Sequence, residues 1–323
     1  MTARAAECRS VAHAIVYSRL GSPDVLHLTE VEVPAPGPGE IGVRIEAAGV
    51  NPIDTKLRAG IRPSPPIVEP RRVGADGAGV VTAVGADVEG FRPGDAVVLF
   101  GGEGLYASDV VVEADRVLPR PAQVSAAQGA ALGIPVATGY QALRSLDVGP
   151  GDTLLLHAGS GAVGQATIQY AVLWGATVIA TASPARFDRI RRLGATPVAY
   201  GEGLADRVRD AAPEGVTVAI DAAGTDEALH TSLELVEDRS RIATLVRGAD
   251  ADALGIRAFS GGSPHPLTDR QTAWRAEALP VTLALLAAGR FDLEPPRELP
   301  LAEAAEAHRL LESGAGGKIV LLP

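Results

Sequence analysis

A glycine-rich segment at residues 159–164 constrains the fold of this chain more than any other feature of its sequence. An apolar run at 152–157 leads into Gly159-x-Gly161-x-x-Gly164, and a helical pattern follows at 165–174. This order is typical of a dinucleotide site, where the three glycines permit a tight turn, close approach of a pyrophosphate and close helix packing. Free N–H groups at the helix start bind the phosphates. The expected contacts are Gly159, Ser160, Gly161, Ala162, Val163 and Gly164.

The segments after this turn repeat the same alternation of strand and helix. Apolar runs at 176–180, 197–200, 216–220 and 242–246 predict strands, and a helical pattern at 187–193 ends at Gly194. Alternating elements of this length indicate an α/β domain, a doubly wound parallel sheet with helices on both faces.

The end of the second strand bears on which cofactor binds. A protein that binds NAD usually places an acid about 20 residues beyond the glycines, to bind the ribose 2′-hydroxyl. This chain has Ser183 and Arg186 there instead, and an arginine can bind a phosphate bidentately. The segment therefore favours NADPH. The alternative is local: Ser183 caps the next helix, Pro184 occupies its first turn and Arg186 is a solvated charge.

The 323 residues exceed what one nucleotide-binding domain needs, so a second domain is expected. Short apolar runs at 13–17, 41–45, 79–84, 95–99 and 109–112 are separated by glycines and prolines. Many short strands with such punctuation predict a small, partly open antiparallel β-barrel.

Composition limits the classes of partner. A net charge of −10 disfavours nucleic acid and anionic membranes. The single cysteine, Cys8, excludes an intrachain disulfide framework, and the six histidines lack metal-ligand spacing. The first residues lack the apolar stretch of a signal peptide, and no apolar run is long enough to span a membrane. We expect a cytoplasmic protein without a metal site.

Several motifs, taken in order, resemble the zinc-free branch of the medium-chain dehydrogenase/reductase superfamily, typified by zeta-crystallin-like quinone oxidoreductases. These motifs are Gly49-Val-Asn-Pro-Ile-Asp-Thr-Lys56, Gly74-Ala-Asp-Gly-Ala-Gly-Val-Val81, Phe91-Arg-Pro-Gly-Asp-Ala-Val97, Thr138-Gly-Tyr-Gln-Ala-Leu143 and Gly317-Lys-Ile-Val-Leu321. The resemblance implies a GroES-like substrate domain from residues 1–134 and 262–323, with a Rossmann domain at 135–261 between them.

The resemblance also implies a chemistry. Zinc-dependent relatives carry a cysteine near Asn51 and a Gly-His-Glu run near Gly74, and this chain has neither. The implied reaction is hydride transfer from NADPH to a small-molecule quinone or activated enone, acceptors that stabilise charge without a Lewis acid. A homodimer is implied, joined through the sheet edge at residues 249–259.

The resemblance assigns roles to individual residues, and each has a local alternative. Asn51 would donate a hydrogen bond to a carbonyl or simply open a turn, and Lys56 would stabilise an oxyanion or form an ion pair with Asp54. Thr138 would contact the nicotinamide ribose or cap a helix. Tyr200 would lie against the 2′-phosphate or end a strand. Lys318 would lie near the cofactor or at the surface.

Two residues bear on the substrate. Arg62 stands near the place where quinone oxidoreductases and enoyl-thioester reductases often have a tyrosine, so it attracts an anionic group or is a solvated loop residue. Phe259 borders the substrate pocket or packs in the core. Two other functions remain as alternatives: an alkene or enoyl-thioester reductase, and a non-catalytic NADPH sensor. His157 lies inside a strand that is expected to be buried, and we interpret it as a core histidine.

Overall fold

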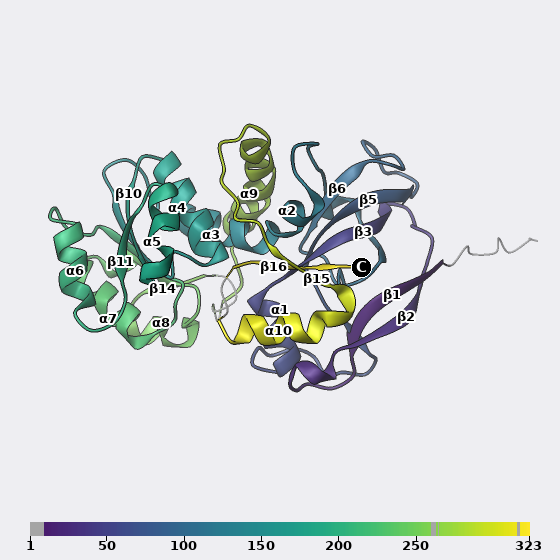
Figure 1. Ribbon diagram of the computed structural model, residues 1–323, viewed down its shortest axis with the longest axis horizontal. Coiled ribbons are helices and arrows are strands. Elements are labelled where there is room, and N and C mark those ends of the chain that lie inside the picture. Colours follow the sequence, from purple (N-terminus) through teal and green to yellow (C-terminus); the bar gives the residue numbers. More distant parts are fainter. Residues whose placement is uncertain (1–9, 260–262, 264, 315–316) are drawn as a thin grey trace, which may run out of the picture. The chain divides into compact units, whose positions relative to one another are not determined.

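The chain forms two compact units. One consists of Met1–Ile134 with Leu283–Pro323 and the other of Pro135–Thr282 (Figure 1). The computed structural model describes residues 10–259, 263, 265–314 and 317–323. Cys8 and the glycines at 261 and 262 therefore lie outside the described residues.

The second unit contains a six-stranded parallel sheet in the order β11-β10-β9-β12-β13-β14. Its strands are β9 (Thr153–His157), β10 (Thr177–Ala182), β11 (Thr196–Ala199), β12 (Val218–Asp221), β13 (Ile242–Thr244) and β14 (Arg257–Ala258). The order reverses direction between β9 and β12, and that switch point is where ligands bind in open α/β sheets. The predicted doubly wound parallel sheet is confirmed.

Helices cover both faces of this sheet. The helices are α3 (Gly133–Ser145), α4 (Ala162–Leu173), α5 (Phe187–Arg192), α6 (Leu204–Ala211), α7 (Asp226–Leu235) and α8 (Gly248–Leu254). Ile179 of β10 belongs to a buried cluster with Val208 of α6 and Leu229 of α7. Because neighbouring residues of a strand point to opposite faces, Ala180 faces the other side, towards α4 and α5.

Helix α9 (Asp269–Ala287) continues this unit beyond the boundary expected from the sequence. The guanidinium of Arg144 lies over the rings of both Trp174 and Trp274, and the hydroxyls of Tyr170 and Thr282 are hydrogen-bonded. These contacts hold the first part of α9 against α3 and α4. The unit boundary consequently falls after Thr282 instead of after residue 261.

The strands of the first unit pair antiparallel, except β15 and β16, which pair parallel. A three-stranded sheet has the order β2-β1-β4, and a seven-stranded sheet has the order β15-β16-β3-β5-β6-β8, with β7 paired to β3. The strands are β1 (Ser10–Tyr17), β2 (His27–Val33), β3 (Glu40–Val50), β4 (Arg71–Arg72), β5 (Asp76–Val84), β6 (Ala96–Phe100), β7 (Asp109–Glu113), β8 (Val117–Pro119), β15 (Arg297–Pro300) and β16 (Ile319–Leu322).

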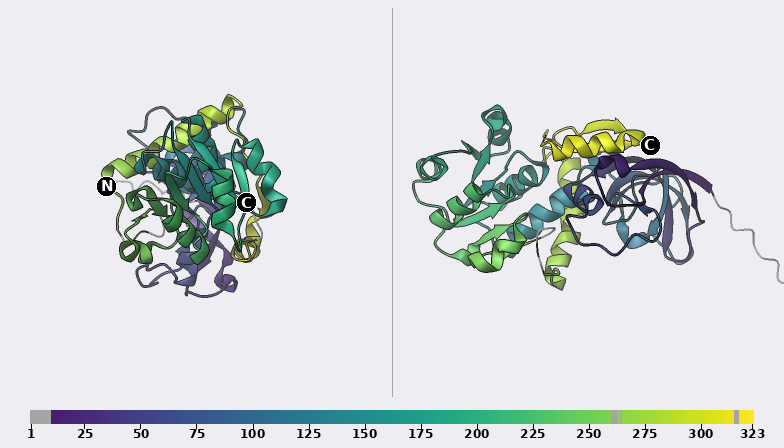
Figure 2. Two further views of the ribbon diagram at one scale, coloured as in Figure 1. Left: turned by 90° about the vertical axis from the view of Figure 1, so that its left-hand side faces the viewer. Right: turned by 90° about the horizontal axis from the view of Figure 1, so that it is seen from below.

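The C-terminal segment completes this unit. Strand β16 pairs with β3 so that Ile319 lies opposite Val50. Helix α10 (Ala304–Glu312), yellow in the right-hand view of Figure 2, packs against α1 (Pro52–Ala59) and the turn Pro23–Val25. The two ends of the described chain thus share one fold unit, as the resemblance implies.

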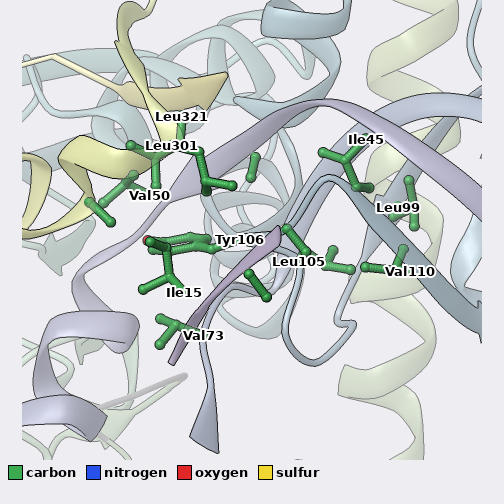
Figure 3. Packing of buried hydrophobic residues seen from close by; sticks show 14 of the residues in the cluster. Ile15, Ile45, Val50, Val73, Leu99, Leu105, Tyr106, Val110, Leu301 and Leu321 are labelled. Atoms are coloured by element: carbon green, nitrogen blue, oxygen red, sulfur yellow. The ribbon is translucent and has the colours of Figure 1, made fainter. Parts of the chain in front are cut away.

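An apolar cluster of described residues forms a core of the barrel-like unit. Figure 3 shows Tyr106 lying among Ile15, Leu105 and Leu301, which come from three separate parts of the chain.

Within the part of the chain that the structure describes, none of the helices has the combination of length and hydropathy that crossing a bilayer requires.

Candidate functional site

The glycine-rich turn joins β9 to α4 at the carboxyl edge of the parallel sheet. A Cβ on Gly159 would lie 2.7 Å from the Cβ of Ala180, and one on Gly164 would lie 2.4 Å from the carbonyl oxygen of Ala158. Both positions therefore exclude a side chain. The left-handed residue of the turn is Ala158 (φ 60°), so Gly159 is needed for close packing rather than for the unusual backbone angle that the sequence suggests.

Gly161 has a different environment. A Cβ at this position would meet only the Ala158 carbonyl oxygen, at an ordinary contact distance of 3.5 Å. Gly161 is also the N-cap of α4, whose first N–H groups have no partner within the helix. The space left above Gly161 and these donors fit a pyrophosphate, since both the approach of the backbone and the helix dipole favour an anion.

The residues expected to select the cofactor surround the end of β10 and β11. Ser183 occupies the N-cap position before Pro184, but its side chain makes no capping hydrogen bond. Arg186 lies at the junction with α5 and is half-buried. Tyr200 follows β11 and is 61% exposed. The local alternative for Ser183, a capping hydroxyl, is thus wrong for this turn.

A buried polar network lies in the other unit, where β3 runs into α1. Asn51 is 1% exposed, and its amide nitrogen donates to Asp76 Oδ2 at 2.9 Å and to the Gly49 carbonyl at 3.3 Å. Its amide oxygen accepts from Lys318 Nζ, which also donates to the Val50 carbonyl at 2.9 Å. Lys318 is 9% exposed, so its alternative as a surface charge is wrong.

The buried network contains ionisable groups of both signs. Lys318 Nζ lies 4.0 Å from Asp76 Oδ2. Burial lowers the pKa of the Lys318 ammonium, while the charges of Asp76 and Asp54 act in the opposite direction. Asp76 Oδ2 also accepts from the Ile134 N–H at 2.9 Å. A cation, a carboxylate and an amide are thus held together out of water, where their mutual electrostatic effects are strong.

Asp54 is a second buried carboxyl, in the first turn of α1. It accepts from the Asn51 N–H at 2.9 Å and from the Tyr106 hydroxyl at 3.0 Å. Burial raises the pKa of Asp54 from 3.8 to about 7, despite these two hydrogen bonds. Asp54 turns inward rather than towards Lys56, so the ion pair considered for these two residues is not formed; residues two apart on a helix do not face each other.

His308 of α10 extends this chain of contacts. Its Nε2 lies 3.4 Å from the Tyr106 hydroxyl, and the two rings meet edge to face. Burial lowers the pKa of His308 to about 3, with the nearby Arg58 charge as a smaller cause. The imidazole is consequently neutral at physiological pH.

The remaining predicted residues lie in varied surroundings. Lys56 and Arg62 are half-buried on and just after α1. Thr138 is buried inside α3 and accepts from Arg275 at 3.4 Å, so it does not cap that helix. Phe259 is 2% exposed, with the Arg257 guanidinium 4.9 Å from its ring centre, which matches its packing alternative.

His157 is a core histidine, as the sequence predicts. It is 1% exposed, its Nε2 lies 3.1 Å from the Ser232 hydroxyl, and burial lowers its pKa to about 4. Asp221, the neighbouring strand-end residue, accepts from the N–H groups of Ala223 and Gly224 and from the Thr244 hydroxyl. This carboxylate orders the loop after β12.

Sequence reasoning missed three members of the buried network. Asp76 lies within the Gly74-Ala-Asp-Gly motif, so an acid within a glycine-rich motif was the available signal. Tyr106 and His308 carry no comparable local signal. Among the described residues, no group of three or more His, Cys, Asp or Glu side chains could hold a metal ion.

Comparisons with known proteins agree with this architecture. Residues 37–122 match the alcohol dehydrogenase GroES-like domain, and residues 162–259 match the zinc-binding dehydrogenase family. The chain is 31% identical to a quinone oxidoreductase of Pseudomonas aeruginosa, over 97% of this chain and 100% of that protein. The crystal structure of Escherichia coli quinone oxidoreductase complexed with NADPH superimposes with a TM-score of 0.83 at 28% identity, covering 96% of this chain and 100% of that one.

A second kind of relative is much longer. The chain is 34% identical to the spectinabilin polyketide synthase system protein NorB of Streptomyces orinoci over 302 residues. That match covers 90% of this chain but only 13% of the polyketide synthase protein.

Proposed function

This chain belongs to the medium-chain dehydrogenase/reductase superfamily, among the quinone oxidoreductases, and we propose that it transfers hydride from NADPH to a quinone or an activated enone without zinc. The observation that carries the proposal is the glycine-rich turn, which has no room for a side chain at Gly159 or Gly164 but has room beside Gly161. Such a turn admits a pyrophosphate at the start of α4. NADPH, when bound, supplies the hydride.

Three residues support NADPH over NADH. Arg186 and Ser183 follow β10, where a carboxylate would repel a 2′-phosphate, and Tyr200 follows the adjacent β11. The NADPH complex of the related Escherichia coli enzyme supports the same choice. Arg186 would bind the phosphate, and Ser183 and Tyr200 would enclose it. Gly159 to Gly164 and Thr138 would hold the remainder of the dinucleotide.

In the buried polar network, the side-chain amide of Asn51 would be the hydrogen-bond donor that polarises the acceptor. Lys318 holds the amide oxygen of Asn51, so the amide N–H groups point away from that ammonium. One N–H is committed to Asp76 at 2.9 Å, whereas the longer 3.3 Å bond to the Gly49 carbonyl is the weaker one. A substrate oxygen gaining negative charge would take this second N–H. Lys56 and Arg62 would add positive charge around the acceptor.

The residue types at this network support the proposed zinc independence. Asn51, Ala75 and Asp76 stand where zinc-dependent relatives have a cysteine and a Gly-His-Glu run, and Asp76 is already bonded to Asn51 and to the Ile134 N–H. Quinones and enones delocalise the incoming charge, so hydrogen bonds suffice. Elemental analysis of purified protein tests this: stoichiometric zinc would contradict the proposal.

Cofactor titration tests the NADPH assignment separately from turnover. Quenching of tryptophan fluorescence would be measured with NADPH and NADH, for wild type and Arg186→Met. We expect NADPH to bind more tightly, and the substitution to weaken NADPH by about ten-fold while leaving NADH unchanged, because only NADPH carries the 2′-phosphate. Equal affinities in the wild type would contradict the assignment.

A second candidate is an alkene reductase acting on an enoyl thioester. The similarity to a polyketide synthase protein over 302 residues favours it. Arg62 weighs against it, because a guanidinium cannot serve as the phenolic acid expected near this place. Parallel assays with a crotonyl thioester and a simple quinone distinguish the two, since the preferred acceptor has the larger kcat/KM.

A homodimer is proposed from the sheet edge. Among the residues that the structure describes, β14 is the edge strand of the parallel sheet, so its outer side could pair with a second copy. Light scattering after size-exclusion chromatography should give twice the 33.1 kDa chain mass. A monomer at micromolar concentration would contradict this.

A further inference from the structure

A buried chain of hydrogen bonds joins α5 to the glycine-rich turn. Arg189 Nε donates to Gln165 Oε1 at 2.7 Å, and Gln165 Nε2 donates to the Ser160 carbonyl at 2.9 Å. Arg189 and Gln165 are 6% and 7% exposed. The turn that admits the pyrophosphate is thus tied, through one amide side chain, to a buried guanidinium on the following helix.

The position of Arg189 is unusual among the charges of its helix. Arg191 and Arg192 are exposed, as expected for a short amphipathic helix, whereas Arg189 points inward next to Ile190. Burying a guanidinium is costly unless hydrogen bonds and nearby negative charge compensate it. An apolar side chain would fill this inward position at less cost, so packing alone does not account for an arginine here.

We propose that Arg189 and Gln165 are positioning residues for the dinucleotide, a role that rests on the proposed NADPH-dependent function. The side-chain amide of Gln165, on α4, binds the Ser160 carbonyl oxygen. This hydrogen bond fixes the Ser160 peptide and so orients the following N–H groups towards the pyrophosphate site. Arg189 fixes the amide of Gln165, because its N–H can bond only the amide oxygen and leaves the NH2 group for Ser160.

This role is distinct from that proposed for Arg186, three residues earlier. Arg186 would bind the 2′-phosphate and so affect NADPH alone. Arg189 acts on the turn that binds the pyrophosphate, which NADPH and NADH share. Loss of Arg189 should therefore weaken both dinucleotides by a similar factor.

Binding measurements on substituted proteins test the proposal. Dissociation constants for NADPH and NADH would be determined by fluorescence for Arg189→Met, Gln165→Leu and the double variant. We expect each single substitution to weaken both dinucleotides about ten-fold, the scale of one charged hydrogen bond. The double variant should be no weaker than either single one, because both remove the same connection to Ser160.

Two variants control for folding and charge. Arg192→Met removes the same formal charge from an exposed position of α5 and should leave both affinities unchanged. Arg189→Lys retains a cationic donor and should recover part of the loss. Urea unfolding identifies variants that are merely destabilised, which would bind normally once folded.

The outcomes separate this proposal from the proposed function. A wild type that binds neither dinucleotide would overturn both. A wild type that binds NADPH, with Arg189→Met weakening NADPH but not NADH, would make Arg189 a 2′-phosphate ligand and overturn the positioning role alone. Unchanged affinities in Arg189→Met, or additive losses in the double variant, would also overturn it.

Discussion

The ammonium group of Lys318 donates a hydrogen bond to the side-chain oxygen of Asn51, 267 residues earlier in the chain. The pairing of β16 with β3, which sets Ile319 opposite Val50, brings these two residues together. Asn51 is thereby fixed in one amide orientation, with its nitrogen towards Asp76. The C-terminal strand thus determines how the proposed acceptor site presents its hydrogen-bond donors.

Replacing Lys318 should reduce turnover more than stability. In Lys318→Met the amide of Asn51 loses the group that sets its orientation, and Asp76 loses a nearby positive charge. We expect kcat/KM for a quinone to fall about ten-fold or more, the effect of one misplaced donor at a developing oxyanion. Lys318→Arg should retain more activity. Steady-state kinetics that show full activity in Lys318→Met would contradict the role of this network.

Substitutions in the glycine-rich turn should separate binding from folding. Gly161→Ala adds a methyl group that meets only an ordinary 3.5 Å contact, so the protein should fold normally but bind NADPH about ten-fold or more weakly. Gly164→Ala places its Cβ 2.4 Å from a backbone oxygen and should lower the unfolding midpoint as well. Urea titrations and NADPH titrations of both variants check this. Normal NADPH affinity in Gly161→Ala would contradict the assigned pyrophosphate site.

Asp54 should make the protein less stable as the pH rises towards neutrality. Burial raises its pKa from 3.8 to about 7, so the folded state holds this proton more tightly than the unfolded state. The stability contribution is complete below about pH 4 and is lost as the pH rises through about 7, a change on the order of 4 kcal/mol. Asp54→Asn should therefore gain stability relative to wild type as the pH rises from about 4 to about 7.

Urea unfolding of wild type and Asp54→Asn across this pH range measures the effect. Tyr106→Phe provides a second check, because removing the hydroxyl that donates to Asp54 should raise the pKa of Asp54 further. A stability difference between wild type and Asp54→Asn that does not change with pH would show that Asp54 does not titrate in this range.

His308 should have the opposite effect on the acid side. Burial lowers its pKa from 6.5 to about 3, so its contribution to stability is complete above about pH 6.5 and is lost as the pH falls towards 3. Wild type should therefore lose stability relative to His308→Gln over this window. His265→Gln, at an exposed histidine, is the matched control and should follow wild type. Parallel acid unfolding curves for wild type and His308→Gln would refute the expectation.

The fold could be predicted well from the sequence because its signals are local. The predicted strand at 176–180 overlaps β10, which begins one residue later and ends two residues later, and the helical pattern at 187–193 contains α5. The second compact unit extends to Thr282 because α9 packs against it through contacts of Arg144 and Tyr170, which are distant in the sequence. Apolar periodicity carries no information about which unit a helix packs against.

The site was predictable only in part. The glycine spacing predicts the tight turn between β9 and α4 directly, whereas the neighbours of Asn51 depend on strand register. Asp76, Tyr106 and His308 come together through pairing between β3 and β5 and packing of α10, which no local pattern encodes. The ion pair considered for Asp54 and Lys56 failed because α1 places them on different faces.

The most direct test of the central claim is the loss of near-ultraviolet NADPH absorbance on mixing purified protein with a panel of quinones and enones, with NADH in parallel. NADPH-selective oxidation, reduced in Asn51→Ala and in Arg186→Met, is the result that we predict. Tight NADPH binding with no turnover of any acceptor would contradict the oxidoreductase function and would instead indicate a sensor.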